Sequence, residues 1–407
     1  MLYRRREYTT LIRRLEEKRR FMQIVIGPRQ IGKTTLIKQV LGDLKERYLY
    51  CEVTRPQATA GFIRTNWDLA RETLSRYQLN SVILVFDEIQ LIPQWSEYVK
   101  KEWDDDTFHD RNIKVVLSGS SRLLLLNGLN ESMMGRYEML HMAHWDFGEI
   151  HENFGLDFDD YILSGGYPVM ADMLRDATDR KGDFYQRIRN YVNNSLLQAI
   201  IRYDLEVDTD LGKGKSVLLE RLLEMGCRYS GQIVSVNKLA GELQEAKSRL
   251  TIAKYLKLLE ESCTLSCLQK YAADAMRRRA SAPKLQVWSN ALKLQYLNAD
   301  RETLRSDHAE WGRIFESAVG AYLLGRSYVE GFEVHYWREG SLEVDFVLQK
   351  GSQIVALEVK SNRETYTEGM GAFIQKFRPQ RTLVVGPAGI RAEDFMSMSV
   401  SDVFDRH

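Results

Sequence analysis

One segment near the amino terminus has the residue types and spacing of a loop that binds nucleotide phosphates. It fits the pattern G-x4-G-K-[ST] and reads Gly27-Pro28-Arg29-Gln30-Ile31-Gly32-Lys33-Thr34, with Thr35 next. The glycines let backbone N–H groups face the phosphates, and a helix that begins near Lys33 adds its positive dipole end. We expect Lys33 to reach the β- and γ-phosphates and Thr34 to ligate magnesium. A glycine-rich turn with a chance lysine is the alternative.

Two carboxylates follow the next long apolar run. Residues 81–86 read SVILVF and are followed by Asp87 and Glu88. A carboxylate at the carboxyl end of a buried strand lies beside the phosphate loop in sheets of this kind. Asp87 is expected to hold magnesium through water, and Glu88 is expected to polarise an attacking water. The pair predicts hydrolysis of the nucleotide, and a simple acidic turn is the alternative.

Three further polar residues are candidates for acting on the terminal phosphate. The run at 113–117 ends in Ser118, and Ser120 follows, so either hydroxyl could sense the γ-phosphate; a plain strand-to-helix turn is the alternative. Arg136 could supply charge to a transferring phosphoryl group, within its own chain or in a neighbouring subunit. For Arg136 the alternative is a surface salt bridge.

A second set of charged residues near the carboxyl terminus lies in strand-like segments. Because alternate residues of a strand share a face, Glu343 and Asp345 are expected on one face, opposite the apolar residues at 344 and 346. Glu358 and Lys360 are likewise expected to point the same way from another strand. Apolar flanks on both strands suggest that one side is buried and the other lines a site.

Magnesium would explain why these charges lie in an apolar core, because burying them without a partner is costly. Asp345 and Glu358 are oxygen ligands of the type that magnesium prefers, and Glu316 on the preceding helix could complete the shell. Lys360 could orient or deprotonate the attacking water. The set predicts phosphodiester hydrolysis. The alternatives are a solvated charged edge, or a nuclease-like fold that binds DNA without cutting it.

The elements that must position these residues follow from the apolar pattern. Strand-like runs at 21–26, 48–53, 82–86 and 113–117 alternate with helical patterns, which predicts a mainly parallel sheet covered on both faces. We therefore expect an α/β P-loop core over 1–150. A mostly helical lid or linker is expected over 151–210, broken at 165–168 by GGYP. Residues 211–285 and 286–407 are expected to form two further domains.

Residues 211–285 have the order of secondary-structure elements that is typical of a winged helix. A short helix at 236–243, a longer helix at 249–262 and a strand-like run at 264–270 give helix, turn, helix and ribbon. Polar residues away from the apolar face of the longer helix could meet phosphates or bases, namely Arg249, Thr251, Lys254 and Lys257. Arg277, Arg278 and Arg279 would lie in the wing and suit contact with a nucleic-acid backbone. Use of the module for protein contacts, or as a lid, is the alternative.

Composition limits these interpretations only weakly. The chain has 407 residues, 28% of them charged, and a formal net charge of +1, so any nucleic-acid contact must come from local patches. Its four cysteines have no ligand spacing for zinc, which favours a reduced, cytoplasmic protein. No segment has the length of a membrane span or the pattern of a signal peptide.

Together these motifs resemble a family of bacterial and archaeal AAA-type ATPases. The resemblance rests on GPRQIGKTT, VFDEIQLIPQW, LSGSSRLLL, the Gly135-Arg136 pair and GGYP, and it extends nearly over the whole chain. In the carboxyl-terminal part it rests on a glycine four residues before Glu316, on EVDF at 343–346 and on LEVK at 357–360. It implies ATP as the nucleotide, an AAA-like core, a winged helix and a restriction-endonuclease-like domain of the PD-(D/E)XK type.

One position departs from that family, whose members usually carry an aspartate where this chain has Ser289 and Asn290. The leading interpretation is an ATPase that uses ATP and Mg²⁺ and whose nucleotide state regulates a DNA-binding carboxyl-terminal half. Mg²⁺-dependent DNA cleavage by that half is a further hypothesis. The alternatives are a nucleotide-driven switch that binds DNA or protein without cleaving it, and an ATPase with no nucleic-acid partner. An oligomer is compatible with all three.

Overall fold

The structure is a computed structural model of the chain. It describes residues 3–119, 125–126, 128–129, 133–177, 183–201, 213–243, 249–274, 281–297, 299–363 and 367–405. The chain divides into two compact units, Met1–Met142 and Ala143–His407. Within the described residues, no helix combines the length and the apolar character needed to cross a membrane.

The first unit is built on a five-stranded parallel sheet. Its strands are β1 (Met22–Ile26), β2 (Arg47–Glu52), β3 (Val82–Asp87), β4 (Ile113–Ser118) and β5 (Tyr137–His141), in the spatial order β2-β3-β4-β1-β5. The predicted parallel sheet is confirmed, and it is typical of the AAA-like P-loop fold. Every residue of β1, β3 and β4 is buried, because helices cover both faces of a sheet of this type.

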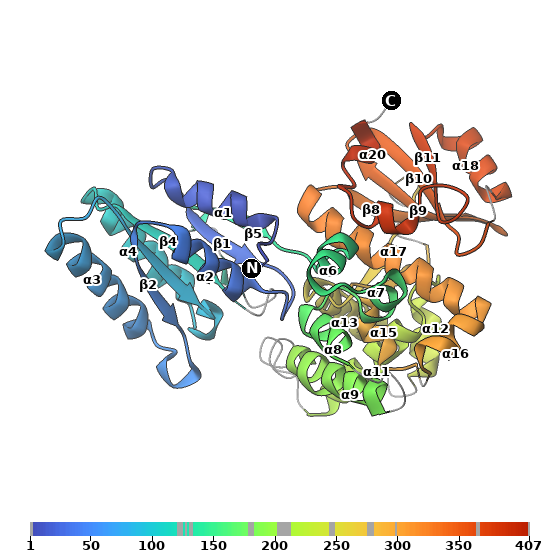
Figure 1. The fold of residues 1–407 in the computed structure, drawn as a ribbon, viewed down its shortest axis with the longest axis horizontal. Helices are drawn as coiled ribbons and strands as arrows, with labels where there is room; N and C mark the ends of the chain where they lie inside the picture. The colour runs from blue at the N-terminus through green and yellow to red at the C-terminus, as the bar shows by residue number, and fades with distance from the viewer. Residues whose placement is uncertain are drawn as a thin grey trace. The chain divides into compact units, whose positions relative to one another are not determined.

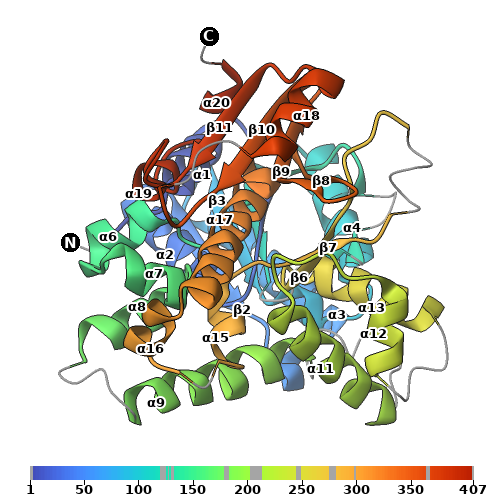
Figure 2. The ribbon, with the colours of Figure 1, turned by 90° about the vertical axis from the view of Figure 1, so that its right-hand side faces the viewer.

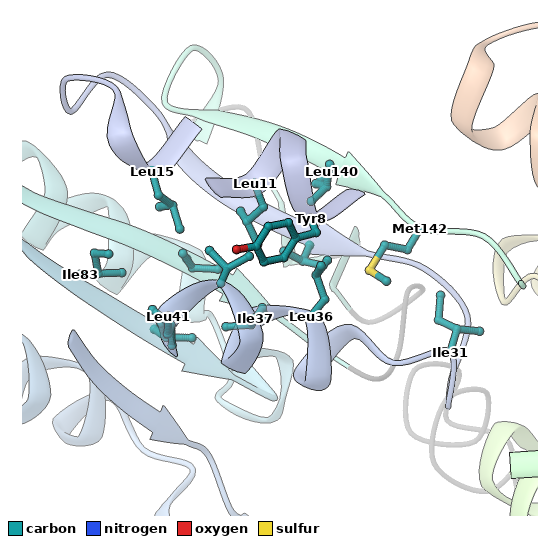
Figure 3. Close-up of a cluster of buried hydrophobic side chains, with 14 residues drawn as sticks. Tyr8, Leu11, Leu15, Ile31, Leu36, Ile37, Leu41, Ile83, Leu140 and Met142 are labelled. Carbon is teal, nitrogen blue, oxygen red and sulfur yellow. The ribbon is translucent and has the colours of Figure 1, made fainter. Parts of the chain in front are cut away.

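Among the described residues of this unit, the helices that cover the sheet (Figure 1) are α1 (Glu7–Glu16), α2 (Lys33–Asp43), α3 (Ala60–Arg76) and α4 (Trp95–Phe108). Helices α1 and α2 pack on one face, where Leu11 and Leu36 join Val25, Ile83 and the neighbouring strand residues in one apolar cluster (Figure 3). On the other face α3 packs on β3, and α4 packs on α3. Short 3-10 turns, η1 (Arg55–Gln57) and η2 (Ile89–Leu91), follow β2 and β3.

The second unit begins with helices and a small ribbon. They are α6 (Phe147–Phe154), α7 (Phe158–Ser164), α8 (Pro168–Arg175), α9 (Asp183–Tyr191), the π-helical segment η4 (Val192–Leu197), α11 (Lys213–Arg228), α12 (Val236–Glu242) and α13 (Arg249–Glu261). Strands β6 (Leu265–Leu268) and β7 (Lys284–Val287) then pair antiparallel. The predicted breaker has a clear local role, because Gly165 ends α7 with a φ of 62° and Pro168 opens α8.

The last part of the second unit contains a four-stranded mixed sheet. The helices before it are α15 (Asn290–Leu294), α16 (Arg301–Ser306) and α17 (His308–Glu330). The strands of the sheet are β8 (Glu333–Glu339), β9 (Leu342–Lys350), β10 (Gln353–Val359) and β11 (Arg381–Val385). Helix α18 (Glu368–Phe377) precedes β11, and α19 (Ala392–Phe395) and α20 (Asp402–Asp405) follow it. The strand order is β11-β10-β9-β8, and only β10 and β11 are parallel. Figure 2 shows the long α17 leading up to this sheet.

A bulge in β9 changes which side chains share a face. Trp337 of β8 pairs with Val344, whereas His335 pairs with Val347, so one residue of β8 faces both Asp345 and Phe346. Val344 and Val347 therefore pack together in the cluster beneath α18. The ring of Phe346 lies on the other side, close to Gly320 of α17. The prediction that residues 344 and 346 share a face is therefore wrong, because an inserted residue shifts the alternation.

Candidate functional site

The predicted phosphate loop connects the end of β1 to the start of α2. Two of its residues have left-handed backbone conformations, Gln30 with a φ of 58° and Gly32 with a φ of 96°, and together they curl the loop. Gly27 must be a glycine, because a Cβ there would lie 2.2 Å from the carbonyl oxygen of Met142. Ile31 packs in the core, whereas Gln30 and Thr35 are exposed. The loop thus presents backbone and short side chains at the amino end of α2.

The Lys33 side chain turns back into this loop. It is only 7% exposed, and its Nζ donates to the carbonyl oxygens of Gly27, at 3.0 Å, and Pro28, at 2.6 Å. A buried ammonium held by two carbonyls inside a curled loop lies where the loop would enclose an anion.

Asp87, at the carboxyl end of β3, joins the predicted residues into one site. Its carboxylate accepts hydrogen bonds from the hydroxyls of Thr34, at 2.8 Å, and Ser118. Tyr50 donates to the same carboxylate, at 2.5 Å, as does the backbone N–H of Glu88, at 3.1 Å. Thr34, Asp87 and Ser118, predicted from separate segments, therefore meet at one edge of the sheet. Ser120, the alternative to Ser118, lies outside the described residues.

The donor set at Asp87 suits a magnesium ion. Carboxylate and hydroxyl oxygens are the ligands that this ion takes from proteins, usually only one or two of them. Asp87 is only 4% exposed, and Thr34 is directly adjacent to the loop lysine in sequence. Asp87 and Thr34 are thus the residues that would hold the ion beside the phosphates.

Glu88 has a strained backbone and an ordered side chain. Its φ of 58° is in the left-handed region, which is uncommon for a residue other than glycine. Its Oε2 accepts a hydrogen bond from Nε2 of Gln90, at 2.5 Å. Gln90 in turn packs against Gly119 at the tip of β4, where a Cβ would lie 2.0 Å from the Gln90 Oε1. Sequence reasoning missed Gln90 and Gly119, although both flank predicted residues.

Arg136 lies at the other end of the sheet from the phosphate loop. Its backbone carbonyl accepts from the N–H of Met22, the first residue of β1, whereas the loop follows the last residue of that strand. The guanidinium forms an ion pair with Asp104 of α4, at 2.7 Å. The structure therefore does not bring Arg136 to the nucleotide site of its own chain, and the pairing matches the salt bridge considered as its alternative.

In the second unit, Asp345 and Glu358 lie where β9 and β10 separate. The last regular pair of these strands is Phe346 with Leu357. Beyond it the Asp345 carboxylate accepts from the backbone N–H of Val359, at 2.8 Å, in place of a strand-to-strand bond. The Glu358 carboxylate accepts from the hydroxyl of Thr367, and its Oε2 is 3.6 Å from Nζ of Lys360. Asp345, Glu358 and Lys360, three of the four residues predicted for the nuclease-like site, are thus neighbours.

The fourth predicted residue, Glu316 of α17, has a cationic partner. Its Oε1 is 2.5 Å from Nζ of Lys284, the first residue of β7, which is fully buried. The same Nζ donates to the carbonyl oxygen of Asp345, at 3.1 Å, and is 3.7 Å from Oε1 of Glu343. Burial raises the pKa of Glu316 to about 7, although the Lys284 ammonium opposes the shift. Sequence reasoning missed Lys284, which lies in a strand-like run outside every motif.

These contacts fit a divalent ion only in part. Asp345 and Glu358 offer two carboxylates, and Oε2 of Glu358 is buried without a hydrogen-bond donor from the part of the chain that the structure describes. Burial raises the pKa of Glu358. Across the described residues, no three acidic, histidine or cysteine side chains are grouped as a metal site would need. The Asp345–Glu358 pair fits one ion, and Glu316 is engaged by Lys284.

Two other predicted features can be located. The exposed face of α13 carries Arg249, Lys254 and Lys257, and Lys257 is 3.7 Å from Glu261. The arginines at 277–279 lie outside the described residues. Asn290, where the resembled family usually has an aspartate nearby, donates from Nδ2 to the carbonyl oxygens of Ile162 and Ile314, each at 2.9 Å. An aspartate has no such donor, so the amide has a structural role here.

Comparison with known families assigns the first unit. Residues 19–151 match a family described as AAA domain. This region, which holds the loop, Asp87 and Glu88, is therefore an AAA-type P-loop ATPase domain. Residues 155–303 and 311–394 match two families described only as domains of unknown function, DUF8612 and DUF4143.

Individual relatives are distant. The uncharacterized protein MJ1544 of Methanocaldococcus jannaschii is 20% identical over 352 residues, which cover 80% of this chain and 72% of that protein. Among solved structures, a mutant RuvB of Thermotoga maritima is 18% identical, covering 64% of this chain and 85% of its own, with a TM-score of 0.34. The ORC1 protein of Aeropyrum pernix in complex with DNA is 12% identical, covering 74% and 91%, with a TM-score of 0.36. AMPPCP-bound DnaA from Aquifex aeolicus is 14% identical, covering 63% and 88%, with a TM-score of 0.32.

Proposed function

We propose that this chain binds and hydrolyses ATP, and that its nucleotide state regulates a DNA-binding carboxyl-terminal half. The observation that carries the proposal is the hydrogen-bond set at Asp87, which links the loop residue Thr34 to the tips of β3 and β4. A carboxylate so placed beside a G-x4-G-K-T loop is the arrangement of a nucleoside triphosphatase.

Each residue of the site has a role that its position supports. Lys33 exchanges its two loop carbonyls for the β- and γ-phosphates, while the backbone N–H groups of the loop hold the phosphates in place. Thr34 and Asp87 would hold Mg²⁺, which would neutralise charge on the phosphates. Glu88, oriented by Gln90, accepts a proton from the attacking water, and Ser118 senses the γ-phosphate.

The middle of the second unit is proposed to bind DNA as a winged helix. The support is the order of α11, α12 and α13 followed by the β6–β7 ribbon, together with the exposed basic residues of α13. Arg249, Thr251, Lys254 and Lys257 would contact the duplex. A gel-shift series at increasing salt tests this: binding should weaken steeply, and replacing Lys254 and Lys257 with alanine should flatten the slope. A gel shift that does not depend on salt would contradict the proposal. An absence of DNA binding in all three conditions, with ATP, with ADP and without nucleotide, would also contradict it.

A second candidate activity is magnesium-dependent DNA cleavage by the nuclease-like domain. The specific support is the pair Asp345 and Glu358, with the buried Glu358 Oε2 and with Lys360 beside it. Asp345 and Glu358 would hold the ion, which would polarise the phosphodiester, and Lys360 would stabilise the added negative charge. Plasmid incubated with the protein, Mg²⁺ and ATP should be nicked, and Asp345→Asn should abolish nicking. Intact plasmid would leave a domain that binds DNA without cutting it.

A further inference from the structure

Lys284 is a buried cation beside Glu316, the residue that the sequence analysis expected to complete a magnesium shell. It opens β7, lies at 0% exposure, and its Nζ is 4.8 Å from the centre of the Phe346 ring. Two carboxylates, of Glu316 and Glu343, and the carbonyl of Asp345 surround that Nζ at 2.5, 3.7 and 3.1 Å. The cation is therefore held by groups from both α17 and β9.

Electrostatics explains why an ammonium is stable there. A buried lysine without partners would lose its proton, whereas neighbouring carboxylates favour the charged form. The pKa of Lys284 is raised despite its burial, because Glu316, Asp345 and Glu343 outweigh the cost of desolvation. A second buried lysine, Lys293 of α15, provides the contrast. Its ion-pair partner is Glu310, at 3.7 Å, and burial lowers its pKa although Glu310 and Glu316 oppose the shift.

We propose that the Lys284 ammonium is the permanent cationic partner of the Glu316 and Glu343 carboxylates, in place of a metal ion. Glu316 is then not a metal ligand, and a divalent ion is confined to Asp345 and Glu358. The ammonium supplies the positive charge that a metal would otherwise bring to Glu316, and two cations cannot share that carboxylate without strong repulsion. This inference goes beyond the proposed function, because it requires neither ATP hydrolysis nor DNA binding.

The position of Lys284 also gives the ion pair a structural consequence. Lys284 is the first residue of β7, which pairs with β6 in the ribbon that follows α13. The ion pair therefore ties that ribbon to α17 and to β9, an inner strand of the four-stranded sheet. The buried charge of this ribbon and the carboxylates of Glu316 and Glu343 are therefore parts of one ion-pair network.

Binding of Mn²⁺, followed by electron paramagnetic resonance of the full-length chain, tests the proposal. Every protein carries Asp87→Asn, so that the nucleotide site contributes no metal. Measurements at about pH 8 keep the carboxylates ionised. The variants are Lys284→Met, Glu316→Gln and the double variant, and Lys293→Met is the matched control because it also removes a buried lysine near α17.

The expected results are specific to Lys284. Glu316→Gln should leave Mn²⁺ binding unchanged within about twofold. Lys284→Met should lower the melting temperature by more than about 5 °C, because it leaves the half-buried Glu316 and Glu343 carboxylates without their cation. Added Mn²⁺ should restore part of that loss, through a new site that the double variant lacks. Lys293→Met should show no recovery with Mn²⁺.

Two outcomes would overturn the proposal. One is a loss of at least about tenfold in Mn²⁺ affinity on Glu316→Gln in the protein that retains Lys284, which would make Glu316 a ligand. The other is a Lys284→Met protein whose stability and Mn²⁺ binding match those of Lys293→Met. If Lys284→Met does not fold, the Glu316→Gln titration alone decides, since that variant keeps the lysine.

Discussion

At the scale of single residues, Asp87 is the centre of the nucleotide site. It accepts hydrogen bonds from the Thr34, Tyr50 and Ser118 hydroxyls, which come from α2, β2 and β4. Motif spacing predicted two of these donors. Tyr50 has no motif of its own, because its contribution depends on the parallel pairing of β2 with β3, which places Tyr50 opposite Val85, near the end of the strand.

Tyr50 should contribute more to the stability of the fold than its place on an edge strand suggests. Burial, followed by its hydrogen bond to Asp87, raises the pKa of Tyr50, so the hydroxyl stays a donor at all physiological pH values. Tyr50→Phe should lower the unfolding free energy by about 1.5–3 kcal/mol in urea titrations, the usual value of a hydrogen bond to a charged group. Tyr48→Phe is the control, because Tyr48 lies on the same strand and is 48% exposed. Equal effects of the two substitutions would show that the bond is unimportant.

Glu316 predicts a pH dependence of stability. Its pKa is about 7 in the folded chain against 4.5 for the ordinary side chain, with Lys284, Lys293, Glu343 and Asp345 facing it. A raised folded pKa means that this group stabilises the fold fully below pH 4.5, and that the contribution declines as pH rises to about 7. The unfolding free energy should therefore fall on the order of 2 kcal/mol more in the wild type than in Glu316→Gln between about pH 4.5 and 8. Parallel pH curves for the two proteins would contradict this.

At the scale of elements, close approach of α17 to β7 and β9 brings Glu316 to Lys284. Gly320 permits it, because a Cβ there would lie 2.2 Å from Oε1 of Gln286 and 2.8 Å from the Phe346 ring. Gln286 cannot easily move, since its Nε2 donates to the carbonyl oxygens of Ser317 and Val287. The helix is therefore held at a distance that only glycine allows.

Gly320→Ala should destabilise the chain by about 1–3 kcal/mol, despite the better helix propensity of alanine. Gly325→Ala in the same helix is the control. Its new Cβ would meet only Ala143, at an ordinary 3.4 Å, so it should be neutral or stabilise by up to about 1 kcal/mol. Thermal unfolding of both variants is the measurement, and a stable Gly320→Ala protein would show that α17 can move away.

The elements also show what the pattern of residues can and cannot predict. A run that is buried on both faces, such as residues 82–86 of β3, is evident from its continuous apolar composition, and the alternation of such runs with helical patterns predicted the parallel sheet. The bulge at Asp345 was not predictable, because nothing in the sequence marks where a strand gains one residue. Lys284 was missed for a related reason. A lysine in a short apolar run resembles an exposed edge residue until the fold brings carboxylates around it.

At the scale of the whole molecule, the position of Arg136 bears on assembly. It lies at the amino end of the sheet, paired with Asp104, so any action on a phosphate requires a neighbouring chain. We expect ATP hydrolysis per chain to rise with protein concentration, and Arg136→Ala to reduce that rise at least about tenfold while leaving ATP affinity unchanged. Asp104→Ala breaks the same ion pair but keeps the arginine. If both substitutions act alike, the pair is structural and Arg136 has no role in catalysis.

The central claim is that the Gly27–Thr34 loop, Asp87 and Glu88 form a site that hydrolyses ATP. Steady-state phosphate release by the purified chain with ATP and Mg²⁺ tests it most directly, with nucleotide affinity measured in parallel. Lys33→Ala should lose nucleotide binding. Glu88→Gln should keep binding and lose at least about a hundredfold in kcat, because the group that accepts the proton from water is gone. Phosphate release by Glu88→Gln at the wild-type rate, or none by the wild type, would contradict the claim.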